Sequence, residues 1–515
     1  MQLVFDALAG AAALVALIIA YRRHKSAEFV AARNRVEAQL EHARLYHEPF
    51  AAAAAQIGDE TAAARLAGVR AMAGLADDWP EHRQACVDVL CAYLRTPCSP
   101  APVLDLSPGD RPRRDAAREV RDTVFGIITA HLRPSAEVSW RNLNLDFTGV
   151  VFDRGDFSGV GFSGGQVSFG GAKFPSGQVS FAGAEFSGGG VSFAGAEFSG
   201  AEVSFARAGF SAGQVEFRRA RFSGSEVGFR GARFSGGEIS FGRTQSGDVG
   251  AGLGYAGFSG AEFSGGDISF SDAEFAGSLV GFGGAEFSGA QVGFGGAEFS
   301  AGKVSFADAT FARGEISYRG ARFSGGEISF GSARFSGAEV SFSGARFSGG
   351  EISFGFAGFS GGQLSFNDAE FSGGRVDFRS ARFSGTRVSF ILSRFNGSQV
   401  GFRLAKFSGG EASFNGAKFT GGPVDFGNAR FSGGLVDFFA AEFSGGLVGF
   451  DGAHFTSEVS FLLAKFSGGE VDFSKVADWS YRPQFDGGGL QPSGVRLPGG
   501  SDASELCRGP SRAGA

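Results

Sequence analysis

The side chains best suited to chemistry in this chain of 515 residues are charged groups that recur at a fixed interval. An acidic block comes first, at Glu262, Glu274, Glu286 and Glu298. A basic block follows in the same repeated position, at Arg322, Arg334, Arg346, Arg382, Arg394, Lys406, Lys418 and Arg430. Like charges directly opposite one another destabilise a sheet, so each block needs compensation or a partner. Two interpretations are open: a solvated face compensated by Glu315, Glu327, Glu339 and Glu351, or a basic strip that binds an acidic partner.

Catalytic and metal-binding groups are the second chemistry to consider. The sequence contains no HExxH motif, no P-loop lysine motif and no paired cysteine ligands. His454 occupies the outward repeat position that other repeats fill with Arg or Glu, so we interpret it as a surface residue. Cys86, Cys91 and Cys98 lack CxxC spacing, and we predict small buried side chains, whose lack of pairing suits a reducing cytoplasm. We therefore expect no enzyme activity, no cofactor and no metal site.

The charged positions belong to a tandem repeat that runs from Phe147 to Phe473. Within it, Phe recurs at intervals of seven and five residues, at 162, 169, 174, 181, 186, 193, 198, 205 and 210. The first four Phe are spaced by five, at 147, 152, 157 and 162. The elementary unit is therefore a pentapeptide centred on Phe, and two units plus a two-residue, Gly-rich insert give a period of twelve.

Strand geometry turns this spacing into a fold prediction. Residues two apart in an extended segment face the same side, so Ala196 and Phe198 both point inward and Glu197 points outward. Gly adopts positive φ without a steric penalty, which suits the Ser-Gly and Gly-Gly pairs to corners. One unit cannot bury its Phe alone, whereas stacked units share a continuous core. We predict an all-β solenoid over residues 143–475.

The unit Ala-Glu-Phe-Ser-Gly, from Ala196 to Gly200, resembles the pentapeptide-repeat proteins, and the match extends from Leu145 to about Phe473. The resemblance implies a right-handed, four-sided β-helix. Because of the two-residue inserts, we predict 24 residues per coil with two bulged corners and about 13 coils. A flatter coil of 12 residues with two sides is the alternative. We further predict that the five extra residues between Phe241 and Phe258 rotate the pattern of corners by one side.

The first residues indicate a membrane anchor, which we place at 1–25. Residues 3–21 are apolar apart from Asp6, and Arg22, Arg23 and Lys25 follow at once. That length spans a bilayer, and positive charges favour the cytoplasmic side. We expect a single-pass protein of the cell membrane with its repeat domain in the cytoplasm. A hydrophobic helix packed on the soluble part is the alternative.

Between anchor and repeat we predict a juxtamembrane helix at 26–50 and a small helical domain at 51–134. Val87, Leu90, Cys91 and Leu94 form a helical stripe, and Pro97 ends it. The segment from Leu66 to Arg95 resembles the helical region that precedes the repeats in bacterial, membrane-anchored members of the family. We interpret this domain as a cap on the first coil. Residues 487–515 have the composition of a disordered tail.

Four classes of function fit a chain of this composition, and we favour a non-enzymatic, membrane-tethered protein-interaction scaffold. The alternative is a DNA-mimic topoisomerase inhibitor of the quinolone-resistance type, but the formal net charge is only −6 and the basic block opposes it. A β-helix enzyme lacks catalytic clusters, and a disordered Phe-Gly polymer would not keep this register. We expect an unidentified protein partner, which the basic strip would make acidic, no nucleic acid, and scope for self-association.

Overall fold

The computed structural model describes residues 21–26, 33, 41, 45–96, 110–222, 226–241, 245–246, 255–486 and 493–499. The chain divides into two compact units. The first comprises Met1–Tyr93 and Cys98–Val124, and the second comprises Leu94–Pro97 and Phe125–Ala515. We describe each unit by itself.

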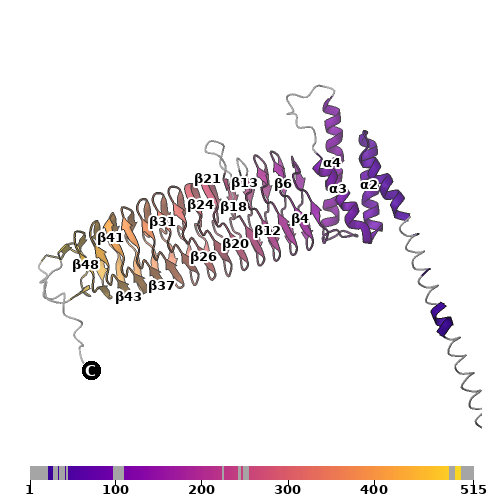
Figure 1. Cartoon of the computed structure of the whole chain (residues 1–515). Helices are drawn as coiled ribbons and strands as arrows, with labels where there is room; N and C mark the ends of the chain where they lie inside the picture. Colours follow the sequence, from indigo (N-terminus) through magenta and orange to yellow (C-terminus); the bar gives the residue numbers. More distant parts are fainter. Residues whose placement is uncertain are drawn as a thin grey trace, which may run out of the picture. The chain divides into compact units, whose positions relative to one another are not determined.

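Helices form the first unit: α2 (Ala62–Asp78), the short 3-10 helix η1 (Pro80–His82), and most of α3 (Arg83–Arg95) and α4 (Asp110–Leu132) (Figure 1). Thr61 caps α2, because its hydroxyl accepts a hydrogen bond from the amide of Ala64. Pro80 begins η1, where its missing N–H costs nothing. The apolar stripes of α2 and α3 are buried, including Val69 and Leu90.

No helix among the described residues is long and apolar enough to cross a bilayer. The predicted membrane span at 3–21 lies outside the described residues except for Tyr21.

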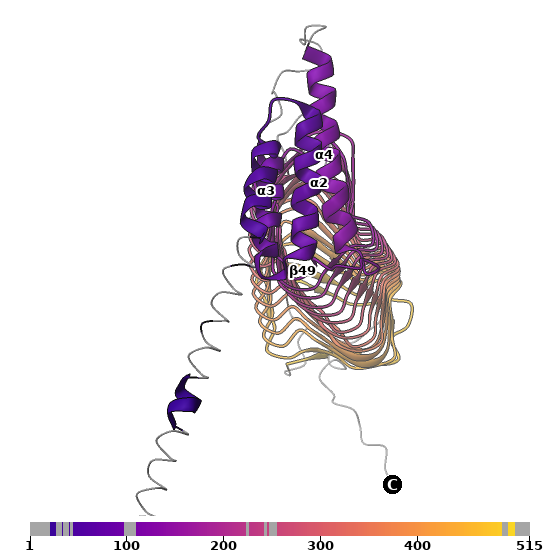
Figure 2. The ribbon, with the colours of Figure 1, turned by 90° about the vertical axis from the view of Figure 1, so that its right-hand side faces the viewer.

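The second unit is a solenoid of about 13 turns made of parallel strands, and it confirms the predicted β-solenoid. Its strands run from β1 (Leu145–Asp146) to β51 (Val495–Arg496) and form two sheets. Sheet A has 25 strands and sheet B has 26 among the described residues. Figure 2 views the coils nearly end-on, and successive coils lie over one another.

Each coil contributes two short strands to each sheet. One coil consists of β7 (Glu185–Phe186) and β8 (Gly190–Ser192) in sheet A, then β9 (Glu197–Phe198) and β10 (Glu202–Ser204) in sheet B. Phe186 pairs with Phe210, and the coil-to-coil contact of Gln214 with Glu238 joins residues 24 apart. The predicted 24-residue coil is therefore confirmed, and the 12-residue alternative is excluded because Phe198 lies in the other sheet.

The two kinds of corner follow from the sequence of the repeat. A tight turn joins the sheets: the amide of Ala196 donates to the carbonyl of Phe193 at 3.0 Å, with Gly195 at φ 67°. The Ser-Gly-Gly insert instead bends the chain between the two strands of one sheet. Gly189 has φ 67°, and a Cβ there would lie 1.9 Å from the carbonyl oxygen of Gly165 in the preceding coil, so only Gly fits. In five coils one strand runs through this bend: β21 (Glu274–Gly281), β24 (Glu298–Ser305), β37 (Arg382–Ser389), β40 (Lys406–Ser413) and β43 (Arg430–Asp437).

Columns of stacked aromatic rings fill the core. Phe186 and Phe210 stack with ring centroids 4.7 Å apart, and Phe193 meets Phe205 edge-on from the other sheet at 5.9 Å. The small residue of each pentapeptide is buried beside its Phe, as at Ala184 and Val191. The sequence predicts this pattern: Ala or Val and Phe face inward, and the residue between them faces outward.

The five extra residues between Phe241 and Phe258 do not rotate the pattern of corners, so that prediction is wrong. Arg221 pairs with Gln245 of β17 (Gln245–Ser246), and Glu226 pairs with Tyr255 of β18 (Tyr255–Gly257). The extra residues therefore fall between Ser246 and Tyr255, at one bend of sheet B. Strand pairing on both sides of the insert continues unchanged. Continuous stacking of the aromatic columns stabilises the solenoid more than an additional side in this coil would. Leu253, the residue at the expected Phe position, lies outside the described residues.

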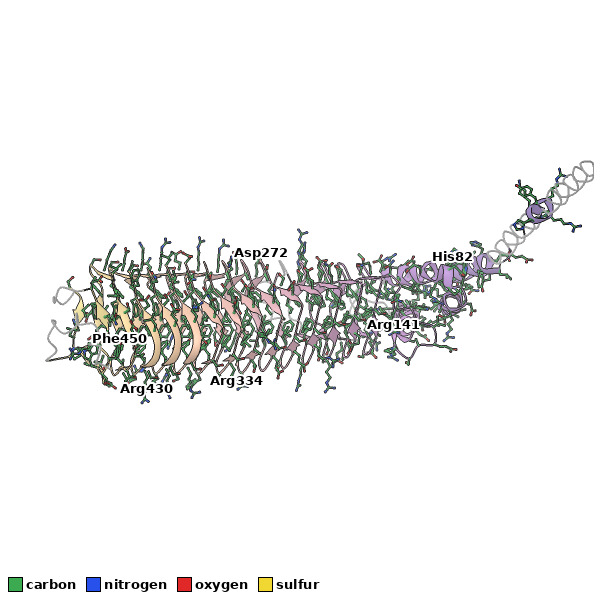
Figure 3. All side chains as sticks on the ribbon, turned by 90° about the horizontal axis from the view of Figure 1, so that it is seen from below. His82, Arg141, Asp272, Arg334, Arg430 and Phe450 are labelled. Carbon is green, nitrogen blue, oxygen red and sulfur yellow. The ribbon has the colours of Figure 1, made fainter. Side chains whose placement is uncertain are left out.

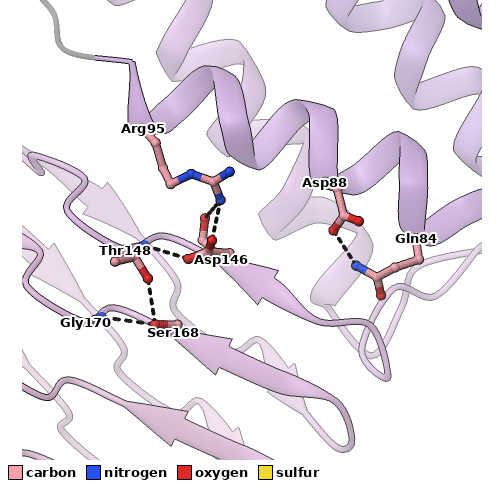
Figure 4. Close-up of polar contacts among 7 residues, drawn as sticks. All are labelled: Gln84, Asp88, Arg95, Asp146, Thr148, Ser168 and Gly170. Carbon is pink, nitrogen blue, oxygen red and sulfur yellow. Dashed lines mark hydrogen bonds and ion pairs between the residues drawn. The ribbon is translucent and has the colours of Figure 1, made fainter.

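Both ends of the solenoid carry aromatic residues that do not belong to the regular repeat. Phe125 of α4 packs against Phe147, Phe152 and Phe157 with ring centroids 5.2 to 6.2 Å apart. Arg95 donates to both the carbonyl and the carboxylate of Asp146 (Figure 4). At the other end, the ring centroids of Trp479 and Phe473 lie 5.3 Å apart.

Strand pairing extends past the predicted boundary at 475. Between 475 and the predicted tail at 487–515, β50 (Gln484–Phe485) pairs with β47 (Val459–Phe461). Within the predicted tail, β51 pairs with β49 (Glu470–Asp472). The ring of Phe485 stacks on that of Phe461 at 5.1 Å. The rest of the predicted tail, 487–492 and 500–515, lies outside the described residues.

Candidate interaction surface

The eight basic residues of the predicted strip are divided equally between the two sheets. Because a coil has 24 residues, positions that recur every twelve alternate between sheet A and sheet B. Sheet A carries row A, which we define as Arg334, Arg382, Lys406 and Arg430. Sheet B carries row B, which we define as Arg322, Arg346, Arg394 and Lys418. Each row contains three arginines and one lysine, so the two rows are chemically matched but do not form a single strip.

Acidic neighbours interrupt row B. Arg322 forms an ion pair with Glu298 in the preceding coil, and Arg346 lies 4.0 Å from Glu370 in the following one. Lys418 Nζ lies 3.2 Å from Glu442 Oε2. The hydrogen bond and the charge of Lys418, followed by those of a second lysine at 465, lower the pKa of the Glu442 carboxyl. Three of the four row B cations are therefore compensated, and the fourth, Arg394, lies in register with Glu370 without an ion pair among the described residues.

Row A has no such compensation. The residues that stack next to row A in adjacent coils are uncharged or histidine. Thr310 comes before Arg334, Gly358 lies between Arg334 and Arg382, and His454 follows Arg430. Within the described part of the chain, no row A side chain forms an ion pair, and all four are exposed. Figure 3 shows Arg334 and Arg430 along the same side of the solenoid, with Asp272 on the opposite side. This row is the basic strip that the sequence predicts, reduced to half its members.

The glutamates predicted to compensate the basic block have other neighbours. Glu327 pairs with Lys303 at 2.9 Å, and Glu351 lies 4.0 Å from Arg375, both in sheet B. Glu315 and Glu339 lie in sheet A, and neither forms an ion pair among the described residues. Glu327 and Glu351 thus pair with cations of their own row, Lys303 and Arg375, and not with row A, which stays unpaired among the described residues.

Row A can attract carboxylates by direct electrostatics. Lys406 pairs in register with Arg382 on one side and Arg430 on the other, so three cations stack at the spacing of a sheet, about 4.8 Å. Like charges at that distance repel, and an acidic partner would relieve the repulsion. Arginine guanidinium groups also bind carboxylates through two parallel hydrogen bonds. Such a row favours fast and specific association more than high affinity.

Exposed apolar side chains accompany row A, and sequence reasoning missed them. Phe356 is 61% exposed with φ 61°, and Leu404 is 43% exposed with φ 62°. Both stand at the second position of a tight turn, where most coils have Gly, Ser or Asn. Phe356 precedes Gly358 by two residues and Leu404 precedes Lys406 by two, so both border row A. Leu392, which is 56% exposed, borders Arg394 of row B in the same way. A large apolar residue at a position that usually requires Gly was the available signal.

Other chemical sites are not supported by the described residues. Cys86 and Cys91 are buried and form no disulfide among the described residues, and burial raises the pKa of Cys86, which makes its thiol unreactive. Cys98 lies outside the described residues. A cavity of about 380 Å³ near Asp425, Asp451 and Asp472 also contains Arg403 and Lys475. Within the residues described, no cluster of three His, Cys, Asp or Glu side chains could hold a metal ion.

The solenoid and its five-residue Phe periodicity are compatible with a pentapeptide-repeat fold. Comparison of the chain with protein-family models, with curated proteins and with solved structures gives no match.

Proposed function

We propose that this chain is a bacterial, membrane-tethered interaction scaffold of the pentapeptide-repeat type, without enzyme activity, that binds an acidic protein partner along row A. The observation that carries the proposal is the contrast between the two matched rows. Three of the four row B cations pair with glutamates of their own sheet, whereas row A presents four exposed cations that no described residue pairs.

The solenoid supports a scaffold because its surface is extended and regular. Each coil contacts mainly its neighbours, so side chains at one repeat position form a straight row with fixed spacing. A buried Phe core holds these rows in place, so outward residues are free to vary without loss of the fold. A long surface with one unpaired basic row suits recognition of an extended acidic segment.

The tether is the finer part of the proposal and rests on the apolar run at 3–21 and the positive charges that follow it. Deleting residues 2–21 should move the chain from the membrane fraction to the soluble fraction. A reporter fused after Ala515 should be active only in the cytoplasm. Activity of that reporter outside the membrane would exclude the proposed orientation, and a membrane-bound deletion variant would exclude the anchor.

The helical residues that belong to the second unit, which include Arg95 and Phe125, act in this proposal as a cap on the first coil. The end of a solenoid exposes unpaired strand edges and core rings, which invite association with other chains. Phe125 covers three Phe of the first coil, and the Arg95–Asp146 ion pair fixes the strand edge beside it. Phe125→Ser should therefore increase aggregation of the chain at a given concentration, whereas Arg141→Ser, at a half-buried position that contacts none of these rings, should not.

Capture of native partners tests the function. The row A variant, R334Q/R382Q/K406Q/R430Q, and the row B variant, R322Q/R346Q/R394Q/K418Q, remove the same number and type of charges. After chemical cross-linking in intact cells, proteins joined to the full-length chain are identified by mass spectrometry. We expect the row A variant to lose acidic partners that the wild type and the row B variant retain. Equal partner sets for all three proteins would contradict the proposal.

The DNA-mimic alternative requires a continuous acidic face. In sheet A the cations of row A follow Glu339 and only scattered acids such as Glu411 lie beyond it, and in sheet B acids and bases are mixed. We therefore do not favour it. A gyrase supercoiling assay with the full-length chain distinguishes the two, because only a mimic would inhibit.

A further inference from the structure

Sheet A divides into an acidic half and a basic half. The acidic half comprises Glu262, Asp267, Glu286, Glu315 and Glu339, all exposed and without an ion pair among the described residues. The basic half begins in the coil of Glu339 and comprises row A together with Arg387, which pairs with Glu411. Along the coils from Glu262 to Arg430, the five acids and row A are therefore unneutralised, each group at its own end of this stretch.

The order of residues along the first outward row of sheet A is complementary to its own reverse. Strand pairing places eight residues in successive coils: Glu262, Glu286, Thr310, Arg334, Gly358, Arg382, Lys406 and Arg430. The midpoint falls between Arg334 and Gly358. If the row is reversed about that midpoint, Glu262 faces Arg430 and Glu286 faces Lys406. Arg334 then faces Gly358, where a Cβ would meet nothing within 4 Å, so the centre leaves room for its long side chain.

We propose that the acidic partner of row A is a second copy of this chain, docked face to face on sheet A with its solenoid antiparallel. This inference rests on the proposed function and names the partner for the same row. A twofold axis along the strand direction reverses the order of coils and keeps each outward row opposite its own equivalent. In the second row, Glu315 then faces Arg387, which also pairs with Glu411 of its own chain at 3.3 Å. A parallel arrangement would place acids against acids and bases against bases, which is unfavourable.

The size of the surface is adequate for a specific dimer. Eight coils at about 4.8 Å and a sheet about eight residues wide at about 3.3 Å per residue give an area on the order of 1,000 Å² per copy. Typical stable interfaces use about 800 Å² per partner. Because the contacts are mostly between exposed charges, the dimer is expected to be salt-sensitive, since the Debye length falls to about 3 Å at 1 M salt.

Charge reversal tests the arrangement with the full-length chain in non-ionic detergent. The acid-reversed variant is E262K/E286K, the base-reversed variant is K406E/R430E, and the doubly reversed variant contains all four changes. Wild type should sediment as a dimer at low salt, and the dissociation constant of the dimer should rise at least tenfold at high salt. Each singly reversed variant should be monomeric alone, because like charges then face one another. An equimolar mixture of the two should form heterodimers, and the doubly reversed variant should dimerise again.

A matched control on sheet B keeps the outcome interpretable. The variant E298K/E370K/R346E/K418E changes four charges of the compensated ladder and should dimerise like wild type, with circular dichroism confirming that all variants are folded. Monomeric wild type at every concentration, or singly reversed variants that still dimerise, would overturn the inference. Failure of the folded, doubly reversed variant to dimerise would overturn it as well.

The proposed function can fail separately. If wild type is monomeric but the row A variant still loses acidic partners in cells, the scaffold stands and only the second-copy inference falls. If wild type dimerises as described but neutralising row A leaves the other captured proteins unchanged, row A serves self-association alone and the binding of a different acidic protein falls.

Discussion

Phe234 stacks on Phe263 with ring centroids 4.7 Å apart and planes within 3°, although the chain between them contains the five extra residues of the insert. The preceding pair in the same column, Phe210 and Phe234, has almost the same geometry, with ring centroids 4.8 Å apart and an angle of 4° between the ring planes. The amide of Glu262 also donates to the carbonyl of Ala232 at 2.9 Å, as equivalent residues do in other coils. The aromatic core is therefore continuous across the insert, which is accommodated at the bend between Ser246 and Tyr255.

This continuity predicts that the insert is dispensable for stability. Deleting Asp248–Gly252 restores the usual number of residues at that bend and should change the free energy of unfolding by less than about 1 kcal/mol. Deleting Ser329–Ala333, also five residues, removes a core Phe and shifts every later pair, so it should abolish the cooperative thermal transition. Circular dichroism melts compare the two. Equal losses would show that the insert is part of the core.

A buried tyrosine interrupts the columns of Phe and should weaken the solenoid locally. Tyr318 stacks between Phe294 and Phe342 at 4.6 Å on each side, and its hydroxyl has no hydrogen-bond partner. An unsatisfied buried polar group costs about 1–3 kcal/mol, so Tyr318→Phe should stabilise by roughly that amount. Phe294→Tyr, which adds a hydroxyl to the neighbouring coil, is the inverse control and should destabilise. Chemical denaturation measures both, and destabilisation by Tyr318→Phe would contradict the assignment.

The same tyrosine predicts a loss of stability at high pH. Burial raises the pKa of Tyr318 well above its usual value. In the unfolded chain the phenol releases its proton near pH 10, whereas the buried phenol keeps it. Stability contributed by the protonated, buried form is therefore present below about pH 10 and is lost as pH rises further. Tyr318→Phe should flatten this loss in a titration of thermal midpoint between about pH 9 and 11, and an unchanged profile would contradict it.

Substitution by Ala should destabilise the solenoid by several kcal/mol more at an inward position than at an outward one. Phe330 is fully buried and stacks between Phe306 and Phe354 at 4.8 Å, so Phe330→Ala should destabilise its neighbourhood by about 3–5 kcal/mol. Arg334 is exposed and unpaired, and Arg334→Ala should change stability by no more than about 0.5 kcal/mol. Because repeat arrays can unfold in parts, amide hydrogen exchange of the flanking coils is the suitable measurement. Comparable protection losses would reverse the assignment.

The sequence predicts the fold closely because one spacing determines most of it. Phe at alternating intervals of five and seven specifies which side chains face inward, and the structure stacks Phe186 on Phe210 accordingly. The path of the insert could not be predicted, since a pentapeptide added as a side and one accommodated at a bend have the same length. Stacking of the aromatic columns decides between them.

The candidate surface was only partly predictable for a geometric reason. All eight basic residues occur at one repeat position, but the 24-residue coil sends alternate members to opposite sheets. The neighbours that neutralise row B, such as Glu442 beside Lys418, are in other coils, so their contacts depend on coil size. Phe356 and Leu404 were visible as breaks in the Gly pattern, but only the turn geometry shows that they border row A.

Binding of a defined acidic probe tests most directly whether row A is the functional surface. Fluorescence anisotropy can follow a labelled poly-glutamate peptide titrated with the full-length wild type, the row A variant and the row B variant at low salt. We expect the row A variant to bind at least tenfold more weakly than wild type, and the row B variant to remain within about twofold. Equal weakening by the two variants, or a greater loss in the row B variant, would contradict the account.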